Sequence, residues 1–461
     1  MHQRNLRLFI LFICFVFSRH TYSQLPNDTM IALKDAVQLG EQRYHLLKAR
    51  KYEADAAERN KHVVKYGRLP IIDASYQANL ATANNLIGMF YPSGILPITG
   101  PPSLKNDYHP ATGSAASVLL NWQAITFGEQ NAKENLAQSQ ADSKQLEWKR
   151  EVFMHKINVI SSYLDLLLAY DQANIHIHNI ERIEANLKES RVLVNTGIRP
   201  GVDSALFLTE LSRAKVERLN AIERLKNNQY LLAKLIVSNL IPEPLDTNFI
   251  HRLPGIPLLS EQEVSTHHPY IKYSESLIEV NQLSEELIKK SYLPKLTLWV
   301  TAFARGSGFY PNTPVKTIDG LGLSRYNYGA GLQLSFSILK YGEVQRQLQR
   351  QAYFSKSSEE MLENEKGELI QQLKIANSTF TSSLDIAKET QQQLKDAQYA
   401  FMAMQVRYNT GLVNFSDLIQ TDYNLLKAEL DLKNAFWNGW KALLLLAAVK
   451  GDESIFLNEI K

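Results

Sequence analysis

The sequence has a single cysteine, Cys14, which lies close to its start. Residues 1–23 have the layout of a secretory signal peptide, with two early arginines, an apolar run from Leu8 to Phe17 and polar or small residues up to Ser23. We expect cleavage near Ser23, which leaves an exported chain without cysteine and so without disulfides. Lipidation of Cys14 is disfavoured because the bulky Ile13 precedes it.

The sequence also lacks a strong net charge and long apolar runs. Residues 1–23 carry three arginines and no acidic residue, so their removal takes the formal net charge from +3 to about zero. A neutral chain without a basic cluster gives no electrostatic reason to expect nucleic-acid binding. The later apolar run Ala442–Val449 is far shorter than the roughly 20 residues of a membrane helix. Membrane insertion would therefore require strands in a closed barrel.

Motifs for catalysis, cofactors and metals are missing as well. The sequence has no phosphate-binding glycine loop, no nucleophile elbow and no zinc-binding Cys/His spacing. His176 and His178 lie two apart on a predicted helix, where such neighbours do not share a face. We therefore predict that the protein is not an enzyme and holds no cofactor and no metal.

A large internal repeat is the main feature that is present. The tripeptide Asn195-Thr196-Gly197 recurs as Asn409-Thr410-Gly411, 214 positions later. Further pairs at this offset are Asp203 with Asp417, Ala214 with Ala428 and Gly128 with Gly342, while Leu69-Pro70 matches Leu293-Pro294 at an offset of 224. Several landmarks at one offset predict two copies of one structural unit, with a longer insertion in the first.

Each copy is predicted to contain a helix, two strands, a long helix and a shorter helix. We assign residues 24–240 to the first copy, 241–260 to a linker, 261–450 to the second copy and 451–461 to a C-terminal tail. The predicted strand regions are 69–122 and 293–338, the long helices 128–195 and 342–409, and the helices after them 203–240 and 417–450; the first helices are placed at about 31–65 and 261–290. About 67 helical residues extend roughly 100 Å, which predicts a coiled coil. Periodicity alone leaves open whether the helices form a hollow cylinder or a filled bundle.

The strands show alternation of apolar and polar residues. Ile72, Ala74 and Tyr76 alternate with Asp73 and Ser75, and the other strands behave similarly, although Leu119 falls on the polar side of the least regular one. This pattern suits a barrel wall in a membrane and equally a sheet with one face on a soluble core. Four strands are too few to close a membrane barrel, since the smallest have about eight. A barrel would therefore require several chains.

The segments between paired strands are rich in Gly, Pro, Asn and Tyr, as expected of loops. Four tyrosines lie in or near them: Tyr91, Tyr108, Tyr310 and Tyr326. They fit either an aromatic girdle at a membrane interface or, as we favour, ordinary surface packing.

Taken together, the motifs resemble the TolC family of outer-membrane efflux proteins. The resemblance rests on residues 408–413 with Asp417, on residues 194–197 with Asp203, and on the Leu-Pro pairs before the strands. It also rests on Gly128 and Gly342, expected as the turns where strand becomes helix. It implies a mixed α and β membrane protein, a homotrimer whose 12-stranded barrel lies in the outer membrane and whose helical tunnel lies in the periplasm. It further implies a passive exit duct that works with a periplasmic adaptor and an inner-membrane pump, in efflux or type I secretion. An equatorial belt is implied around residues 240–259 and the tail.

The resemblance also gives roles to residues at the helix turns. Gly197 and Gly411 fit helix C-terminal caps, and Asp203 and Asp417 fit the start of the next helix, where a carboxylate caps backbone N–H groups. That structural role is a sufficient explanation of all four residues.

The family adds a periplasmic gate at these turns. By that resemblance Asp417 belongs to a cation-selecting ring and Asp203 contacts Tyr408. Gln420 stands where a second acidic residue would strengthen the ring, and Val413 stands where an arginine would brace the turn. We therefore expect milder cation preference and fewer links.

One other class of protein fits part of the pattern. A periplasmic adaptor or coiled-coil spacer shares the export signal and the long helices. Such a protein needs no repeated apolar face on four strands, and its helical hairpin is usually single. The strands therefore favour the exit duct.

Overall fold

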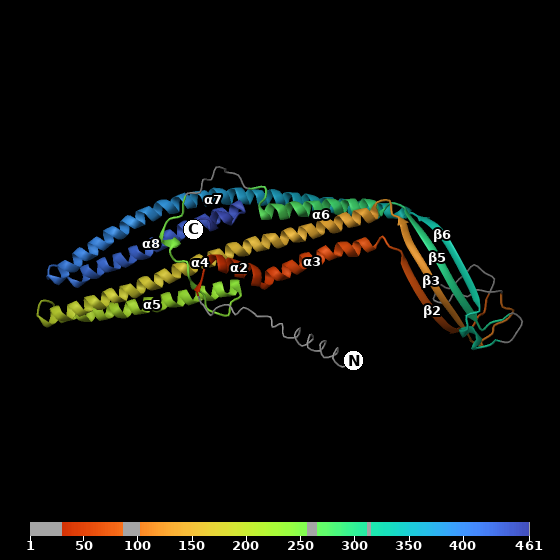
Figure 1. Ribbon diagram of the computed structural model, residues 1–461, viewed down its shortest axis with the longest axis horizontal. Coiled ribbons are helices and arrows are strands. Elements are labelled where there is room, and N and C mark those ends of the chain that lie inside the picture. The colour runs from red at the N-terminus through yellow and green to blue at the C-terminus, as the bar shows by residue number, and fades with distance from the viewer. Residues whose placement is uncertain (1–29, 86–101, 256–264, 311–314, 461) are drawn as a thin grey trace, which may run out of the picture. The chain divides into compact units, whose positions relative to one another are not determined.

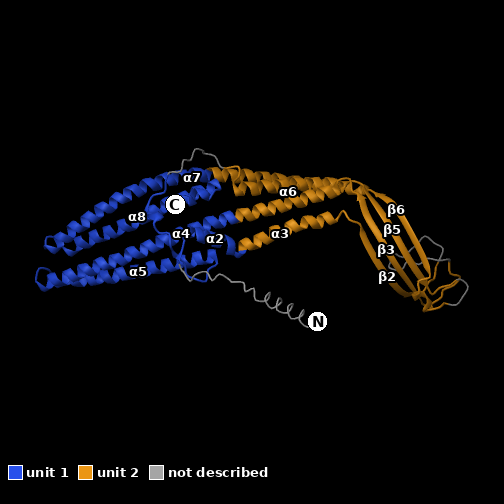
Figure 2. Ribbon diagram, viewed as in Figure 1, with its two compact units in different colours: residues 1–45, 152–263, 371–461 blue, residues 46–151, 264–370 orange. Residues whose placement is uncertain are grey.

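The computed structural model describes residues 30–85, 102–255, 265–310 and 315–460, so the predicted signal peptide and Tyr91 lie outside these ranges. The chain divides into two compact units, shown in Figure 2. Unit 1 comprises residues 1–45, 152–263 and 371–461, and unit 2 comprises residues 46–151 and 264–370. Each unit contains parts of both sequence copies.

Unit 2 contains a four-stranded antiparallel sheet, labelled in Figure 1. Its strands are β2 (Ile71–Ala81), β3 (Ala111–Ile125), β5 (Lys295–Ser307) and β6 (Arg325–Ser335). They lie in the order β2-β3-β5-β6, so β3 and β5 join the strand pairs of the two copies. Pro70 and Pro294 each immediately precede a strand, where a missing N–H does not interrupt the ladder.

The strand register separates apolar from polar residues across the whole sheet. One cross-strand row is Ile72, Leu120, Val300 and Ala330, and the next row on that face is Ala74, Val118, Ala302 and Tyr328. The opposite face carries the rows Asp73, Leu119, Thr301, Gly329 and Ser75, Ser117, Phe303, Asn327. Successive side chains point to opposite faces of a strand. The predicted alternation thus gives one apolar face and one mainly polar face, with Leu119 on the polar side.

Among the described residues, nothing covers the apolar face or the outer edges of this sheet. Leu80, Tyr328 and Leu332 of the apolar face are each more than 60% exposed. Within the described ranges, β2 and β6 each pair along one side only. A wide exposed apolar surface and open strand edges are both unusual for a sheet of a soluble monomer.

The chain passes from strand to long helix differently in the two copies. Phe127 and Gly128 both have positive φ, and α4 (Glu129–Asn195) starts directly after them. In the second copy a 3-10 turn, η3 (Ile338–Lys340), leads into α7 (Tyr341–Asn409). Gly342 lies inside α7 with ordinary helical φ, so its expected role as the turn is wrong.

The remaining helices alternate with these elements along the chain. They are α2 (Leu33–Arg43), α3 (His45–Tyr66), α5 (Gly201–Ile236), α6 (Pro269–Ser291), α8 (Phe415–Lys450) and α9 (Ser454–Leu457). Two first helices differ from expectation. The helix expected at 31–65 is interrupted at Tyr44, whose backbone is extended and whose ring stacks on His155 at 4.1 Å. The helix expected from 261 starts at Pro269, because proline suits the first helical position and His268 caps it by accepting the N–H of Tyr270.

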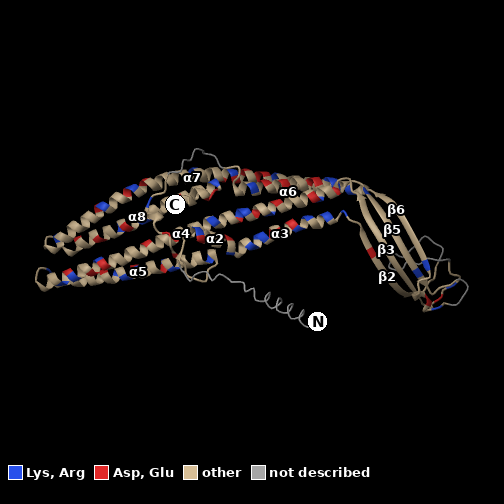
Figure 3. Cartoon of the chain, viewed as in Figure 1, with Lys and Arg blue, Asp and Glu red and all other residues tan. Residues whose placement is uncertain are grey.

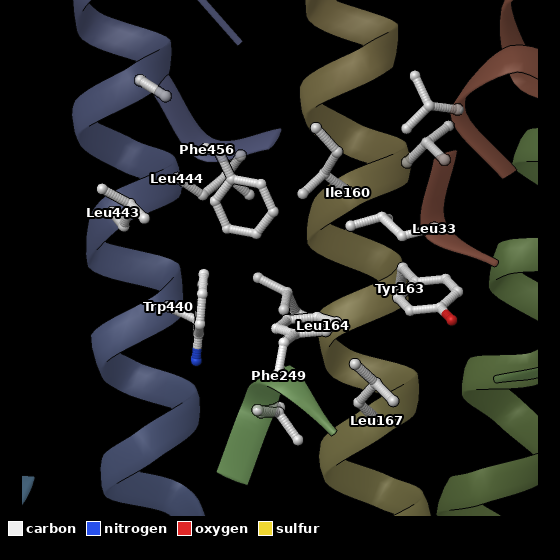
Figure 4. Packing of buried hydrophobic residues seen from close by; sticks show 14 of the residues in the cluster. Leu33, Ile160, Tyr163, Leu164, Leu167, Phe249, Trp440, Leu443, Leu444 and Phe456 are labelled. Carbon is white, nitrogen blue, oxygen red and sulfur yellow. The ribbon is translucent and has the colours of Figure 1, made fainter. Parts of the chain in front are cut away.

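Unit 1 is built around an apolar core at the middle of α4. Ile160, Tyr163 and Leu164 are fully buried, and α8 contributes Trp440 and Leu443 to the same cluster, as Figure 4 shows. Side chains are buried on several sides of α4 here. Contrary to expectation, α4 is long and apolar enough, by length and composition, to cross a membrane. More than half of its most apolar stretch is nevertheless buried inside the structure. That burial is typical of a core helix.

The linker and the tail both pack into this core. β4 (Glu243–Pro244) pairs in parallel with β1 (Met30–Ile31), and η1 (Phe249–His251) follows. The rings of Phe249 and Phe456 lie edge-on to Trp440, with ring centroids 4.9 and 5.7 Å from the indole, and Figure 4 labels all three residues. Edge-to-face contacts are a preferred arrangement of aromatic rings. The two segments expected to form a belt thus share one anchoring residue, while residues 256–259 lie outside the described ranges.

Candidate functional site

Two helix turns in unit 1 contain the predicted gate residues. The first turn, residues 195–200, joins α4 to α5, and the second turn, residues 409–414, joins α7 to α8. Figure 1 labels the four helices that the two turns join. Side-chain contacts between them, described below, place the two turns next to each other.

Both turns end the preceding helix with the same backbone motif. In the first turn, the N–H of Ile198 bonds to the carbonyl of Leu193 and that of Gly197 to Val194. In the second turn, Leu412 bonds to Arg407 and Gly411 to Tyr408 in the same way. Gly197 and Gly411 have φ of 77° and 82°, a region where a side chain would be strained. These are Schellman caps, and the repeated Asn-Thr-Gly tripeptide produces both.

The helices that follow the turns start differently. Asn414 caps α8, accepting the N–H of Asp417 at 2.9 Å while the Asp417 carboxylate accepts the N–H of Asn414 at 3.4 Å. In the first turn Pro200 takes the capping position and offers no side-chain acceptor. Asp203, which corresponds to Asp417, is 6% exposed and bonds elsewhere. Equivalent aspartates therefore have different roles: Asp417 caps its own helix, and Asp203 contacts the other hairpin.

The Asp203 carboxylate binds the phenol of Tyr408 from the other hairpin. The Tyr408 hydroxyl donates to Oδ2 of Asp203 at 3.1 Å, and its ring is 1% exposed. Burial raises the pKa of Tyr408, and the hydrogen bond to Asp203 raises it further, so the phenol keeps its proton. Phe207 packs edge-on to Tyr408 and to Phe415, with ring centroids 6.0 and 4.7 Å apart. The polar link is thus enclosed by aromatic rings from both hairpins.

An arginine that the sequence analysis did not single out forms a second link. Arg199 of the first turn donates to the carbonyl of Tyr408 at 2.7 Å and to that of Val413. Its guanidinium also lies 4.3 Å from the centre of the Tyr408 ring. The offset of 214 pairs Arg199 with Val413, the position where an arginine was expected. The repeat itself was therefore a signal that could have identified Arg199.

The other predicted site residues lie at the surface of the turns. Asp417 and Gln420 are both exposed and, three positions apart on α8, lie on one side of the helix. Gln420 donates to Asn424 at 3.2 Å. Asn195 is exposed, and Asn409 donates to Glu189 at 2.9 Å. The predicted gate set therefore separates into a buried pair, Asp203 and Tyr408, and an exposed pair, Asp417 and Gln420.

A buried ionic cluster farther along the same helices was also missed by sequence analysis. Arg182 of α4 donates to both carboxylate oxygens of Glu429 of α8, at 2.8 and 3.0 Å, and its Nε lies 3.4 Å from Asp422. Asp422 is 5% exposed, and this burial raises its pKa to about 6, although Arg182 acts in the opposite direction. His176 and Asp422 line one cavity. Burial lowers the pKa of His176, because it disfavours the charged imidazolium. Charged residues are scattered along the long helices, as Figure 3 shows, and gave no signal that these would meet.

The comparison with protein families confirms the predicted resemblance to outer-membrane efflux proteins. Residues 290–447 match the family model described as outer membrane efflux protein. That segment covers the strands β5 and β6, the whole of α7 and nearly all of α8. No curated protein matches the sequence.

Solved outer-membrane channels share the fold across nearly the whole chain. The outer-membrane channel OprN superposes with a TM-score of 0.72 at 13% identity, covering 91% of this chain and 89% of OprN. CmeC of Campylobacter jejuni gives 0.70 at 15% identity, covering 93% and 89%. VceC of Vibrio cholerae gives 0.71 at 14% identity, covering 91% and 96%. The chain therefore has the fold of these channel proteins.

Proposed function

We propose that the chain is one protomer of a homotrimeric outer-membrane duct through which a periplasmic adaptor and an inner-membrane pump expel substrate. The main support for this proposal is the arrangement of side chains on the sheet. Its register gathers the apolar residues of four strands on one exposed face and leaves both edges of the sheet open. An apolar face suits the lipid of the outer membrane, and a mainly polar face suits an aqueous lumen.

Edge pairing between copies would close this sheet. A four-stranded sheet is below the roughly eight strands of the smallest membrane barrels, whereas three copies supply 12 strands. In such a ring β6 of one protomer pairs with β2 of the next, which satisfies the open N–H and C=O groups of both. The duct itself is then passive, and the inner-membrane pump supplies the energy for transport.

The paired turns are the proposed periplasmic entrance of the duct. Two of the links that join the hairpins within one protomer involve both turns closely: Tyr408 with Asp203, and Arg199 with the carbonyls of the second turn. Opening requires the second turn to leave the first, which breaks both links. The exposed Asp417 is free to attract cations entering the lumen, and the neutral Gln420 makes that preference mild.

An adaptor or spacer function explains the long helices but not the sheet. A soluble protein would leave the apolar rows around Val300 and Tyr328 in water, at a cost of about 25 cal/mol for each Å². The exit duct is therefore the function that this geometry supports best.

Planar-bilayer recording of the detergent-purified protein tests the proposal. We expect wild type to give small, cation-preferring steps and Asp203→Ala/Asp417→Ala to give larger, less selective ones. Asp142→Ala/Asp385→Ala, which removes two exposed aspartates from α4 and α7, is the matched control and should resemble wild type.

Two outcomes would count against the proposal. Steps that are the same in wild type and in the double variant would place the entrance away from these turns. A folded protein that stays soluble without detergent and never conducts would exclude the duct and favour the adaptor.

A further inference from the structure

Two arginines face each other on the mainly polar side of the sheet, at its loop end. Arg305, near the end of β5, and Arg325, the first residue of β6, are direct cross-strand partners. Like charges in this arrangement repel each other and destabilise the strand pair. Both side chains are exposed, and no carboxylate forms an ion pair with either among the described residues. The sheet thus keeps an unfavourable pair of cations together.

The surroundings of this pair form a shallow site rather than a flat surface. A cavity of about 400 Å³ lies on the sheet beside the two guanidinium groups. Ala115 lies between Gln77 and Arg305 in one cross-strand row. Gly113 lies between Asn79 and Ser307 in the neighbouring row, so small residues leave room there. Among the described residues, the cavity lining contains these two arginines and no acidic residue.

Nearby acidic groups are engaged elsewhere. Asp107 accepts from His109 at 2.8 Å, and Asp319 lies 3.6 Å from Lys316 and accepts from Tyr310. The Arg305 guanidinium lies over the ring of Phe303, with its carbon 5.6 Å from the ring centre. Phe303 is two residues away on the same face, so this contact keeps Arg305 on the cavity side.

We propose that Arg305 and Arg325, assisted by the amide of Gln77, bind a phosphate-type oxyanion on this face of the sheet. Two guanidinium groups offer paired N–H donors that match phosphate oxygens. A bound dianion also removes the repulsion between the two cations. The proposal rests on the proposed function only for the origin of the ligand: a phosphate-bearing solute in the lumen, or the phosphate of a lipid headgroup at the rim.

Titration calorimetry with inorganic phosphate tests the site directly. The samples are the full-length protein in a maltoside detergent, Arg305→Gln/Arg325→Gln, and Arg305→Lys/Arg325→Lys, which keeps the charge and loses the paired donors. We expect at least roughly tenfold weaker binding in the glutamine variant, with the lysine variant in between. Arg346→Gln/Arg350→Gln, exposed arginines of α7, removes the same charge elsewhere and should bind as wild type does. Equal phosphate affinity in wild type and the glutamine variant would overturn the site.

Phosphorus analysis of the purified samples separates the two origins. Lipid phosphate retained by wild type and lost in the glutamine variant assigns the site to a headgroup. Equal lipid content, together with weaker block of bilayer currents by inorganic phosphate in that variant, assigns it to a lumen solute. Phosphate binding by a protein that never conducts would keep the site and overturn the duct. Conduction without arginine-dependent phosphate binding would keep the duct and overturn the phosphate site.

Discussion

The two helix turns of unit 1 have the same backbone and different side-chain contacts. Gly197 and Gly411 end their helices with identical hydrogen bonds. Beyond the glycines the turns differ. Arg199 and Asp203, which follow Gly197, form hydrogen bonds to the other hairpin, whereas Asn414 and Asp417, which follow Gly411, bond to each other. A repeat can thus conserve a fold while dividing two tasks, cross-linking and surface charge, between its copies.

Single substitutions of the paired aspartates should separate these tasks most clearly. Asp203→Ala removes the acceptor of Tyr408, so we expect the bilayer conductance to rise severalfold because the second turn is released. Asp417→Ala should leave the conductance near that of wild type and reduce the cation preference, because its side chain is exposed. Equal effects of both substitutions on conductance would show that the turns are functionally equivalent after all.

The pH dependence of stability should differ between the hairpins because of Asp422. Its pKa is raised to about 6 from 3.8, so the neutral acid is favoured in the folded protein. Its contribution to stability is complete below pH 4 and is lost as pH rises to about 6. At about 1.4 kcal/mol for each pH unit, wild type should lose on the order of 3 kcal/mol relative to Asp422→Asn across this range.

Denaturant unfolding in detergent at pH 4, 5, 6 and 7 measures that difference. Asp385→Asn, an exposed aspartate of α7, is the control and should track wild type. In the first hairpin the equivalent of Asp422 is Leu208, so the effect belongs to one copy alone. A constant gap between wild type and Asp422→Asn would show that the carboxylate is ionised throughout.

Removing Arg199 tests whether the first turn supports the second. Arg199→Ala loses a charged hydrogen bond to each of two carbonyls and the contact with the Tyr408 ring. We expect about 2 kcal/mol less protection of the amides at 408–414 in hydrogen exchange, since such bonds contribute roughly 1.5–3 kcal/mol. Arg191→Ala, an exposed arginine of α4, should leave protection unchanged. Unaltered exchange in Arg199→Ala would mean that the second turn is held by its own cap.

The glycine caps should show the smallest difference between the turns. Gly197→Ala and Gly411→Ala each force alanine into a left-handed conformation, at about 1–2 kcal/mol. Neither added methyl group meets an atom closer than 4.0 Å, so the two costs should be equal. Gly201→Ala, at ordinary φ in the first turn of α5, is the control and should not destabilise. Unequal melting temperatures for the two cap variants would reveal a contact specific to one turn.

Local signals in the sequence predicted much of this structure. The Asn-Thr-Gly repeats predicted both left-handed glycines, and strand alternation predicted the two faces of the sheet. The interruption at Tyr44 was not predictable, because neither glycine nor proline stands at it and its ring stacks on His155, over 100 residues later. Pro269, in contrast, was a readable start signal for α6 that was overlooked.

Contacts between distant segments were predictable only through the repeat or the family. The resemblance placed Asp203 beside Tyr408 and missed Arg199, because the family's arginine was sought in the second turn. Nothing in the sequence paired Arg182 with Glu429, since both look like members of solvated helix faces. The gate role of the exposed Asp417 and Gln420 stays a prediction.

The pairing of β3 with β5 has a consequence for how fast the chain folds. Asn121 pairs with Trp299, 178 positions later, whereas β2–β3 and β5–β6 are pairings within one copy. Closing so long a loop costs chain entropy before any contact compensates for it, so non-local strand pairing is slow. Each strand pair can therefore form early as a separate ribbon, and the step that unites them sets the pace. Before the ribbons join, each has two unpaired edges. The risk of aggregation is therefore greatest in this folding intermediate and lower in the folded protein.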